Sequence, residues 1–162
     1  MANNLDTIQT ERLSFYGINE ADVDVIVKWR SNPEVYKYFK SSHKITREEH
    51  LAWYRSSYLA NQNRFDWICI EKASSKKIGV FGLVREDDLA EVNYLLDPEA
   101  QHKGYALEGI MALVRYSASK WNIKMVYAEI HKKNLPSIKA VKKLDFHIVE
   151  NKGDFVKYGI EV

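Results

Sequence analysis

The chain has 162 residues, of which 46% are hydrophobic and 28% charged, as in a soluble globular protein with one domain over 1–162. Its net charge of +2 is too small to indicate binding to nucleic acid or to an anionic membrane. No apolar run approaches the roughly 20 residues that cross a bilayer, and "MANNLDTIQTERL" shows no signal pattern. The single cysteine, Cys69, cannot form an internal disulfide, so we expect a cytoplasmic protein.

The first third of the chain predicts one strand and two helices. "RLSFYGI" alternates apolar and polar residues, which is typical of a strand. Asn19 and Thr46 are good N-cap residues, and an amphipathic pattern follows each of them. Asn32 precedes Pro33 and is biased away from helical backbone, so the first helix ends there. The predicted elements are a strand at 12–18, a helix at about 20–30 and a helix from 47 to about 59.

From residue 64 onward the apolar period is mostly two, which predicts strands. A helix begins after Gly104, and another begins at Asn134 and Pro136. The chain order β-α-α-β-β-β-α-β-α-β-β predicts an α/β sandwich with a single mixed, mostly antiparallel sheet of about seven strands and about four helices. The six later strands are predicted at 64–72, 76–86, 90–97, 124–130, 146–150 and 155–162.

A phosphate-binding loop is predicted where the strand at 90–97 leads into the helix after Gly104. A helix N-terminus offers free backbone N–H groups and a partial positive charge, which favour a phosphate. Gly104 has no side chain and Ala106 has a small one, so an anion could approach the backbone closely. An ordinary tight turn between a strand and a helix has the same features, and these residues alone leave both interpretations open.

Two motifs resemble those of the GNAT family of N-acetyltransferases. "QHKGYA" at 101–106 is similar to the family's pyrophosphate loop, Q/R-x-x-G-x-G/A. "NLPSIKAVKKLDF" at 134–146 is similar to its N-x-x-S/A-x-x-x-x-x-x-L-G-F segment. "TERLSFYGINEADVDVIVKWR" at 10–30 resembles the family's first strand and helix, so the likeness covers essentially the whole chain. The resemblance implies a GNAT-like sandwich and an enzyme that moves an acetyl group from acetyl-CoA to an amine.

The resemblance also implies where acetyl-CoA, the co-substrate, would bind. Backbone amides of the 101–106 loop would hold the pyrophosphate. The strand that ends near Leu95 and Leu96 would splay from the strand at 125–130, and pantetheine would lie between them, approached by Asn134. The predicted acetyl-CoA-binding residues are Leu95, Leu96, Gln101, His102, Lys103, Gly104, Tyr105, Ala106 and Asn134.

The sequence departs from the family pattern at two positions. Many members have a tyrosine seven residues after the motif asparagine, as the acid that protonates the leaving thiolate, but Val141 stands here. The usual glycine before Phe146 is Asp145, which tolerates a left-handed C-cap better than most residues. The first departure keeps open a non-catalytic sensor that only binds acetyl-CoA.

The reaction needs a base, because an amine attacks only when it is unprotonated. Glu129 is the first candidate and Glu91 the second, although each could be a solvent-facing or ion-paired strand residue. Ser137 matches the position where some members without the tyrosine use a serine donor, but it could instead satisfy a backbone group. Neither His102 nor His131 pairs with a second ligand at metal spacing, so no metal is predicted.

The acceptor is suggested by "WRSNPEVYKYFKSSHKITREEHLAWY" at 29–54, which resembles a segment of bacterial nucleotide-linked amino-sugar N-acetyltransferases. The candidate substrate-binding residues are Trp29, Arg30, His50 and Trp53. Arginine can bind a diphosphate, and tryptophan can stack on a base or a sugar. The two tryptophans could instead pack the two helices together.

Other acceptors stay open beside this small-molecule amine. An N-terminal acetyltransferase of ribosomal proteins would need an acidic groove for a basic peptide. A polyamine or aminoglycoside acetyltransferase would need several carboxylates, for which "REDD" at 85–88 is a candidate. The sequence also leaves a homodimer open.

Overall fold

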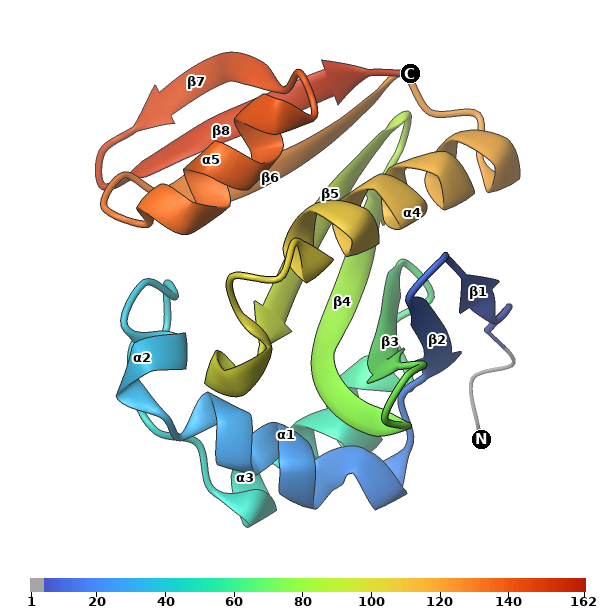
Figure 1. Ribbon diagram of the computed structural model, residues 1–162, viewed down its shortest axis with the longest axis vertical. Helices are drawn as coiled ribbons and strands as arrows, with labels where there is room; N and C mark the ends of the chain where they lie inside the picture. The colour runs from blue at the N-terminus through green and yellow to red at the C-terminus, as the bar shows by residue number, and fades with distance from the viewer. Residues whose placement is uncertain (1–4) are drawn as a thin grey trace.

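The computed structural model describes residues 5–162, which form one mixed sheet of eight strands with helices on both faces (Figure 1). The strand order is β1-β2-β3-β4-β5-β6-β8-β7. Neighbouring strands are antiparallel except β5 and β6, which are parallel. "MANN", the start of the segment without a signal pattern, lies outside the described residues. No helix within 5–162 has the length and apolarity needed to span a membrane.

The strands are β1 Ile8–Gln9, β2 Leu13–Gly17, β3 Arg64–Glu71, β4 Lys76–Glu86, β5 Leu89–Leu96, β6 Met125–His131, β7 His147–Lys152 and β8 Phe155–Glu161. The α-helices are α1 Val23–Arg30, α2 Pro33–Tyr36, α3 Arg47–Trp53, α4 Tyr105–Lys120 and α5 Leu135–Lys143. Short 3-10 turns cover Glu20–Asp22 and Pro98–Ala100, and a π turn extends α3 over Tyr54–Tyr58.

All seven predicted strands are present, and the α/β sandwich is confirmed. The extra strand, β1, is only two residues long and gives no periodicity to detect. The predicted break after α1 is also confirmed, since Asn32 has an extended backbone with a ψ of 120°. Pro33 then starts the short helix α2, because the Asn32 side chain accepts a hydrogen bond from the Glu34 N–H.

Alternation along the central strands divides the core into two layers. Phe81, Val92 and Leu96 point toward α4, in a core whose fully buried members include Leu113. Ile68, Val80 and Leu95 point the other way, toward Ile26, Trp29 and Tyr54 from α1 and the π turn. Successive residues of one strand therefore pack against helices on opposite faces of the sheet.

The strands β5 and β6 diverge in the middle of the sheet. They pair only at Leu89 with Met125, Ala90 with Val126 and Glu91 with Tyr127. Beyond these pairs, β5 continues to Leu96 and β6 to His131 with no ladder between them. The splay predicted from the family resemblance is thus present, and the next section describes what lines it.

Candidate active site

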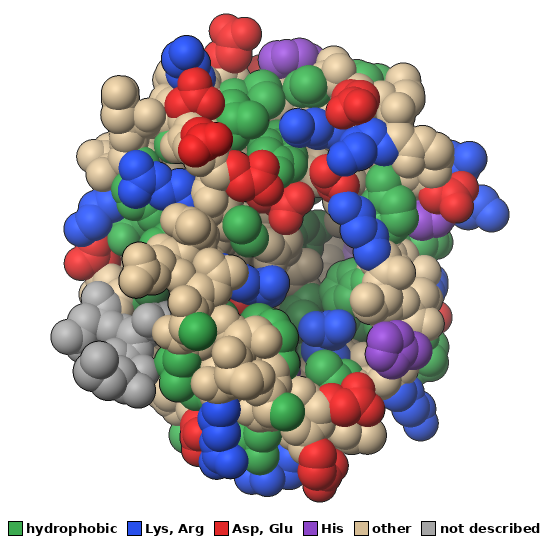
Figure 2. Space-filling model, turned by 180° about the vertical axis from the view of Figure 1, so that it is seen from behind, with side chains coloured by type: hydrophobic (Ala, Val, Ile, Leu, Met, Phe, Trp, Pro, Cys, Tyr) green, Lys and Arg blue, Asp and Glu red, His purple; other side chains and the backbone are tan. Residues whose placement is uncertain are grey.

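A cavity of about 650 Å³ passes through the gap between β5 and β6. It reaches both faces of the sheet, since Ile26 and Arg30 of α1 line it together with Ile110 of α4 and Val141 of α5. Figure 2 shows the molecule hollowed near its centre, with lysine or arginine side chains around the opening. We refer to the half beneath α4 and α5 as the cofactor side and to the half facing α1, α3 and residues 37–45 as the acceptor side.

The loop at 101–106 ends at the N-terminus of α4, on the cofactor side. Gly104 is the N-cap with a φ of 80°, a left-handed backbone that glycine adopts at little cost. Arg12 holds the loop, because its Nη1 donates to the Lys103 carbonyl at 2.8 Å and its Nε to Glu108 Oε1 at 2.7 Å. The free N–H groups of the first turn of α4 are the donors that a pyrophosphate would bind.

The start of α5 brings three polar side chains together at the cofactor end of the gap. Asn134 caps the helix, and its Oδ1 accepts a hydrogen bond from the Ser137 N–H at 3.4 Å. The Ser137 and Tyr94 hydroxyl oxygens lie 2.6 Å apart. Val141 is fully buried and lines the cavity, so it supplies no acid where the family's tyrosine would stand. Asp145, with a φ of 65°, adopts the left-handed conformation predicted for it.

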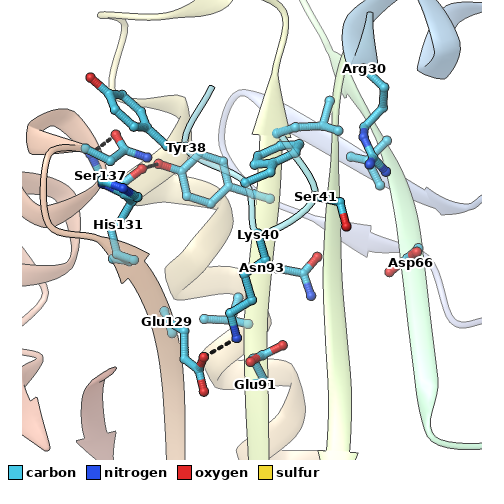
Figure 3. A pocket seen from close by; sticks show the side chains of 18 of the residues that line it. Arg30, Tyr38, Lys40, Ser41, Asp66, Glu91, Asn93, Glu129, His131 and Ser137 are labelled. Atoms are coloured by element: carbon cyan, nitrogen blue, oxygen red, sulfur yellow. Dashed lines mark hydrogen bonds and ion pairs between the residues drawn. The ribbon is translucent and has the colours of Figure 1, made fainter. Parts of the chain in front are cut away.

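Two glutamates flank the gap in different electrostatic settings. Glu129, on β6, forms an ion pair with Lys40 (Figure 3) and a second one with Lys152 at 2.9 Å. Burial alone would raise the pKa of Glu129, but the hydrogen bonds and charges of the two lysines outweigh burial and lower it. Glu91, the last β5 residue paired with β6, has no hydrogen bond or ion pair with any described residue. Burial, and next the charge of Glu129, raises the pKa of Glu91.

Residues 12–147 match the acetyltransferase (GNAT) domain. The chain belongs to the GNAT family of acetyltransferases. Its activity is transfer of an acetyl group from the co-substrate acetyl-CoA to an amine.

Relatives of this acetyltransferase agree with that assignment. The uncharacterized N-acetyltransferase p20 of Bacillus licheniformis is 30% identical over 153 residues, which cover 88% of this chain and 83% of that protein. The spermidine N-acetyltransferase from Vibrio cholerae, solved with CoA and spermine, has a TM-score of 0.84 at 18% identity, covering 94% of this chain and 96% of that one. RimL, a ribosomal L7/L12 alpha-N-protein acetyltransferase solved with coenzyme A, has a TM-score of 0.84 at 15% identity, covering 97% and 98%. At these identities the solved structures show the shared fold.

The acceptor side of the acetyltransferase contains three buried polar atoms without a partner. They are Arg30 Nε, His50 Nδ1 and Asp66 Oδ1, and no other such atom is found within the described residues. All three residues line the cavity. Burial, and next the charge of Arg30, lowers the pKa of His50, which favours its neutral form. Buried polar groups are almost always hydrogen-bonded, so these three atoms are exceptions among the described residues, and all three belong to the cavity wall.

Of the four residues predicted to bind substrate, three line the cavity and one does not. Arg30, His50 and Trp53 are on its wall. Trp29 is only 2% exposed, and its indole N–H donates to Asp97 Oδ2 at 3.1 Å, which fixes α1 to the loop after β5. The prediction that Trp29 contacts the substrate is therefore wrong, and the alternative that it packs the core is correct.

Two of the predicted cofactor residues can offer only their backbone. Leu96 points into the core beneath α4, whereas Leu95 lines the cavity, because successive strand residues face opposite ways. The Tyr105 side chain is also engaged elsewhere: its hydroxyl donates to Glu71 at 2.6 Å, and its ring lies 4.5 Å beneath the Arg12 guanidinium. Its backbone N–H is one of the first-turn donors of α4 that have no partner within the helix.

Sequence reasoning missed several residues of the site. Asp66 gave a signal, since an acidic residue inside the apolar run "FDWICIE" is unusual, but Lys40 and Asn93 gave none. The carboxylates of "REDD" do not line the cavity; Asp88, in the turn between β4 and β5, pairs with Lys124 at 3.2 Å. Within 5–162 no three His, Cys, Asp or Glu side chains are grouped as metal ligands.

Proposed function

We propose that this acetyltransferase acts on a nucleotide-linked amino sugar and that Glu91 is the base that takes the proton from its amine. One observation carries the proposal. A single cavity joins the gap between β5 and β6 to a pocket lined by Arg30, His50 and Trp53. An amine held at Glu91 would face the gap from the acceptor side, while the rest of the substrate lies against cationic and aromatic side chains suited to a diphosphate, a base and a sugar.

Acetyl-CoA would enter from the opposite side of the sheet. In the proposal the backbone N–H groups of 101–106 hold its pyrophosphate. Its pantetheine arm follows the unpaired edge of β5 past Leu95 and Asn134, both of which line the cavity. The acetyl group would then lie in the gap between the two strands.

We place Glu91 ahead of Glu129 as the base, reversing the order suggested by sequence alone. A substrate amine arrives as an ammonium ion, and a good base has a pKa raised toward the working pH. Glu91 is unpaired and its pKa is raised by burial, whereas Glu129 is neutralised by Lys40 and Lys152. A carboxylate that already pairs with two ammonium groups is a weak base, so Glu129 would take a proton from the substrate ammonium less readily.

Ser137 is the proposed donor to the leaving thiolate. The Val141 side chain has no proton to donate, but the cavity wall carries the hydroxyl groups of Ser137 on α5 and Tyr94 on β5, whose oxygens lie 2.6 Å apart. A thiol has a pKa near 8.5, so its thiolate leaves readily and needs only modest help. Tyr94, hydrogen-bonded to Ser137, would orient the serine hydroxyl.

A polyamine is the second candidate acceptor, because four carboxylates line the cavity. They belong to Glu49, Asp66, Glu91 and Glu129. Their combined attraction for a polycation is weakened, since Arg64 pairs with Asp66 at 3.2 Å and two lysines pair with Glu129. We therefore place the amino sugar first and the polyamine second.

The test is an acceptor screen in which acetyl-CoA is held constant and the release of free thiol is recorded. The panel contains UDP-linked amino sugars, spermidine, an aminoglycoside and basic peptides, and mass spectrometry identifies each product. We expect the highest kcat/KM for a UDP-amino sugar. Turnover restricted to spermidine, to the aminoglycoside or to a peptide would reject the amino-sugar proposal. Tight acetyl-CoA binding without thiol release for any amine would indicate the sensor.

A further inference from the structure

Two charged side chains of the cavity lack any partner, and they carry opposite charges. Among the described residues that line it, Arg30 and Glu91 are the partly buried charged groups without a hydrogen bond or ion pair to protein. The other charges are either paired, as Arg64 is with Asp66 and Lys40 with Glu129, or exposed, as Glu49 is. Figure 3 shows Arg30 and Glu91 at opposite ends of the acceptor side.

Arg30 is positioned to bind an anion. Its Nε is buried without a partner, and its guanidinium lies 5.4 Å from the ring centre of Phe39. Burial lowers the pKa of Arg30, yet a guanidinium stays protonated in proteins. A buried cation without a counter-ion is unfavourable, and Asp66, the acidic group near it, already shares its charge with Arg64. A phosphate or carboxylate on the substrate would supply the missing charge and accept from the planar fork.

On the acceptor side, the side chains of Asp66 and Asn93 line the cavity beside Gly82. Asp66, Gly82 and Asn93 lie opposite one another on β3, β4 and β5. A Cβ atom at position 82 would lie 2.3 Å from Asp66 Oδ1 and 2.8 Å from Asn93 Oδ1, so both side chains turn over the glycine and occupy the space above it. Asp66 Oδ1 accepts no hydrogen bond, and the Asn93 amide has none to a described residue. The Asp66 carboxylate and the Asn93 amide can therefore accept hydrogen bonds from a ligand's hydroxyl or N–H groups.

We infer that the acceptor is an anionic amine: its amino group lies at Glu91, hydrogen-bond donors such as hydroxyl groups lie against Asp66 and Asn93, and a phosphate or carboxylate binds Arg30. The inference rests on the proposed function insofar as Glu91 marks the reacting amine. Anionic amines are a broader class of acceptor, and a nucleotide-linked amino sugar is one member of that class. The inference also separates this enzyme from acetyltransferases of polycations, because an added ammonium group at Arg30 would be repelled.

The first experiment compares two acceptors that differ only in the anion, glucosamine and glucosamine 1-phosphate. We expect kcat/KM to be at least about tenfold higher for the phosphate ester in the parent enzyme, as for a charge-assisted contact. Arg30→Gln should bring that ratio close to one, and Arg30→Lys should keep part of it. Lys28→Gln, an exposed residue of the same helix, is the matched control and should leave the ratio unchanged. Equal kcat/KM for the two acceptors in the parent, or a ratio unaffected in Arg30→Gln, overturns the inference.

The second experiment needs no turnover and so remains decisive if neither glucosamine is a substrate. Inorganic pyrophosphate is titrated calorimetrically into protein saturated with CoA, whose own pyrophosphate then occupies the loop at 101–106. We expect binding that weakens about tenfold or more in Arg30→Gln and is unchanged in Lys28→Gln. Absence of binding to the parent, or equal binding to Arg30→Gln, rejects the anion site.

The two hypotheses fail in distinguishable ways. If pyrophosphate binding depends on Arg30 but no UDP-amino sugar is acetylated, the amino-sugar function fails and the anion site stands. If a UDP-amino sugar is acetylated equally by the parent and by a folded Arg30→Gln enzyme, the function stands and the anion site fails. Circular dichroism and acetyl-CoA affinity verify that each variant is folded.

Discussion

The cofactor side and the acceptor side of the cavity differ in how their polar groups are satisfied. On the cofactor side the side chains bond to one another: Arg12 to Glu108 and the loop carbonyl, and Ser137 to Tyr94. On the acceptor side Arg30, His50 and Asp66 each keep a buried polar atom without a partner. We propose that the cofactor side is a preformed scaffold whose backbone groups bind acetyl-CoA. In the same proposal the acceptor side is completed only by its own ligand and determines the specificity of the enzyme.

The largest effect is expected at Gly104, in the loop on the cofactor side of the cavity. Gly104→Val should weaken acetyl-CoA binding on the order of 100-fold, or about 2.7 kcal/mol, because a β-branched side chain is strained at a φ of 80° and would obstruct the phosphate. Gly153→Val is the matched control, since Gly153 has a φ of 74° in the turn between β7 and β8 and open space around it. Calorimetry should show normal affinity in that control. Normal affinity for acetyl-CoA in a folded Gly104→Val protein would rule out 101–106 as the loop that binds the pyrophosphate.

The next effect concerns Glu91, the proposed base at the gap between β5 and β6. Glu91→Gln should lower kcat by about 100-fold, the usual loss when a general base is removed, whereas Glu129→Gln should cost much less. Because burial raises the pKa of Glu91, the parent's kcat/KM should fall with decreasing pH at a value above 4.5, the ordinary glutamate pKa. Protonation of the base causes this acidic limb, so Glu91→Gln should lack it. An acidic limb that survives in Glu91→Gln and disappears in Glu129→Gln would reverse the assignment.

A smaller effect is expected from adding a side chain at Gly82, beneath Asp66 and Asn93 of the acceptor side. In Gly82→Ala the new methyl group would displace the carboxylate and amide oxygens beside it, which lie 2.3 Å and 2.8 Å from an ideal Cβ. We expect KM for the acceptor to rise about 30-fold, equal to ~2 kcal/mol of overpacking. The Kd for acetyl-CoA should stay the same, because Gly82 shares its face of β4 with Val80, toward α1, and not with Phe81, toward α4. An equal loss for both ligands would mean that the sheet itself had been distorted.

The smallest effect is expected at the hydrogen-bonded hydroxyl groups of Ser137 and Tyr94. Ser137→Ala should reduce kcat by about 10-fold, or ~1.4 kcal/mol of barrier, since a thiolate leaves without full protonation. Tyr94→Phe should reduce it less, because it removes only the group that orients the serine. Rapid-quench measurement of the chemical step is the readout for both variants. If each turns over like the parent, proton delivery to sulfur does not limit the reaction and no acid need be assigned.

The cofactor side could be predicted from the sequence because its determinants are local. Gly104 and Asn134 each stand at the start of a helix, and the loop and the cap are short segments whose motif and structure coincide. The direction of side chains could not be predicted there. The predicted contact of Tyr105 with the cofactor is through the backbone, and Glu71 and Arg12, distant in sequence, hold its side chain.

The acceptor side was only partly predictable, because its residues meet through the sheet. Asp66 and Asn93 become neighbours only because β3, β4 and β5 pair in one register across Gly82. The position of each residue in the chain does not indicate that the two are neighbours. Trp29 and Arg30 illustrate the same limit at finer scale, since adjacent helix residues point in different directions and only Arg30 reaches the cavity.

A crystal structure of the enzyme with acetyl-CoA would show whether the acetyl group reaches the acceptor through the gap between β5 and β6, as we propose. We expect the pyrophosphate to lie on the backbone of 101–106 and the sulfur to lie near Ser137. The acetyl carbonyl should then lie between the two strands with Glu91 on its far side. A pantetheine arm that runs outside the gap, or a thioester that ends away from Glu91 and Ser137, would contradict the proposal.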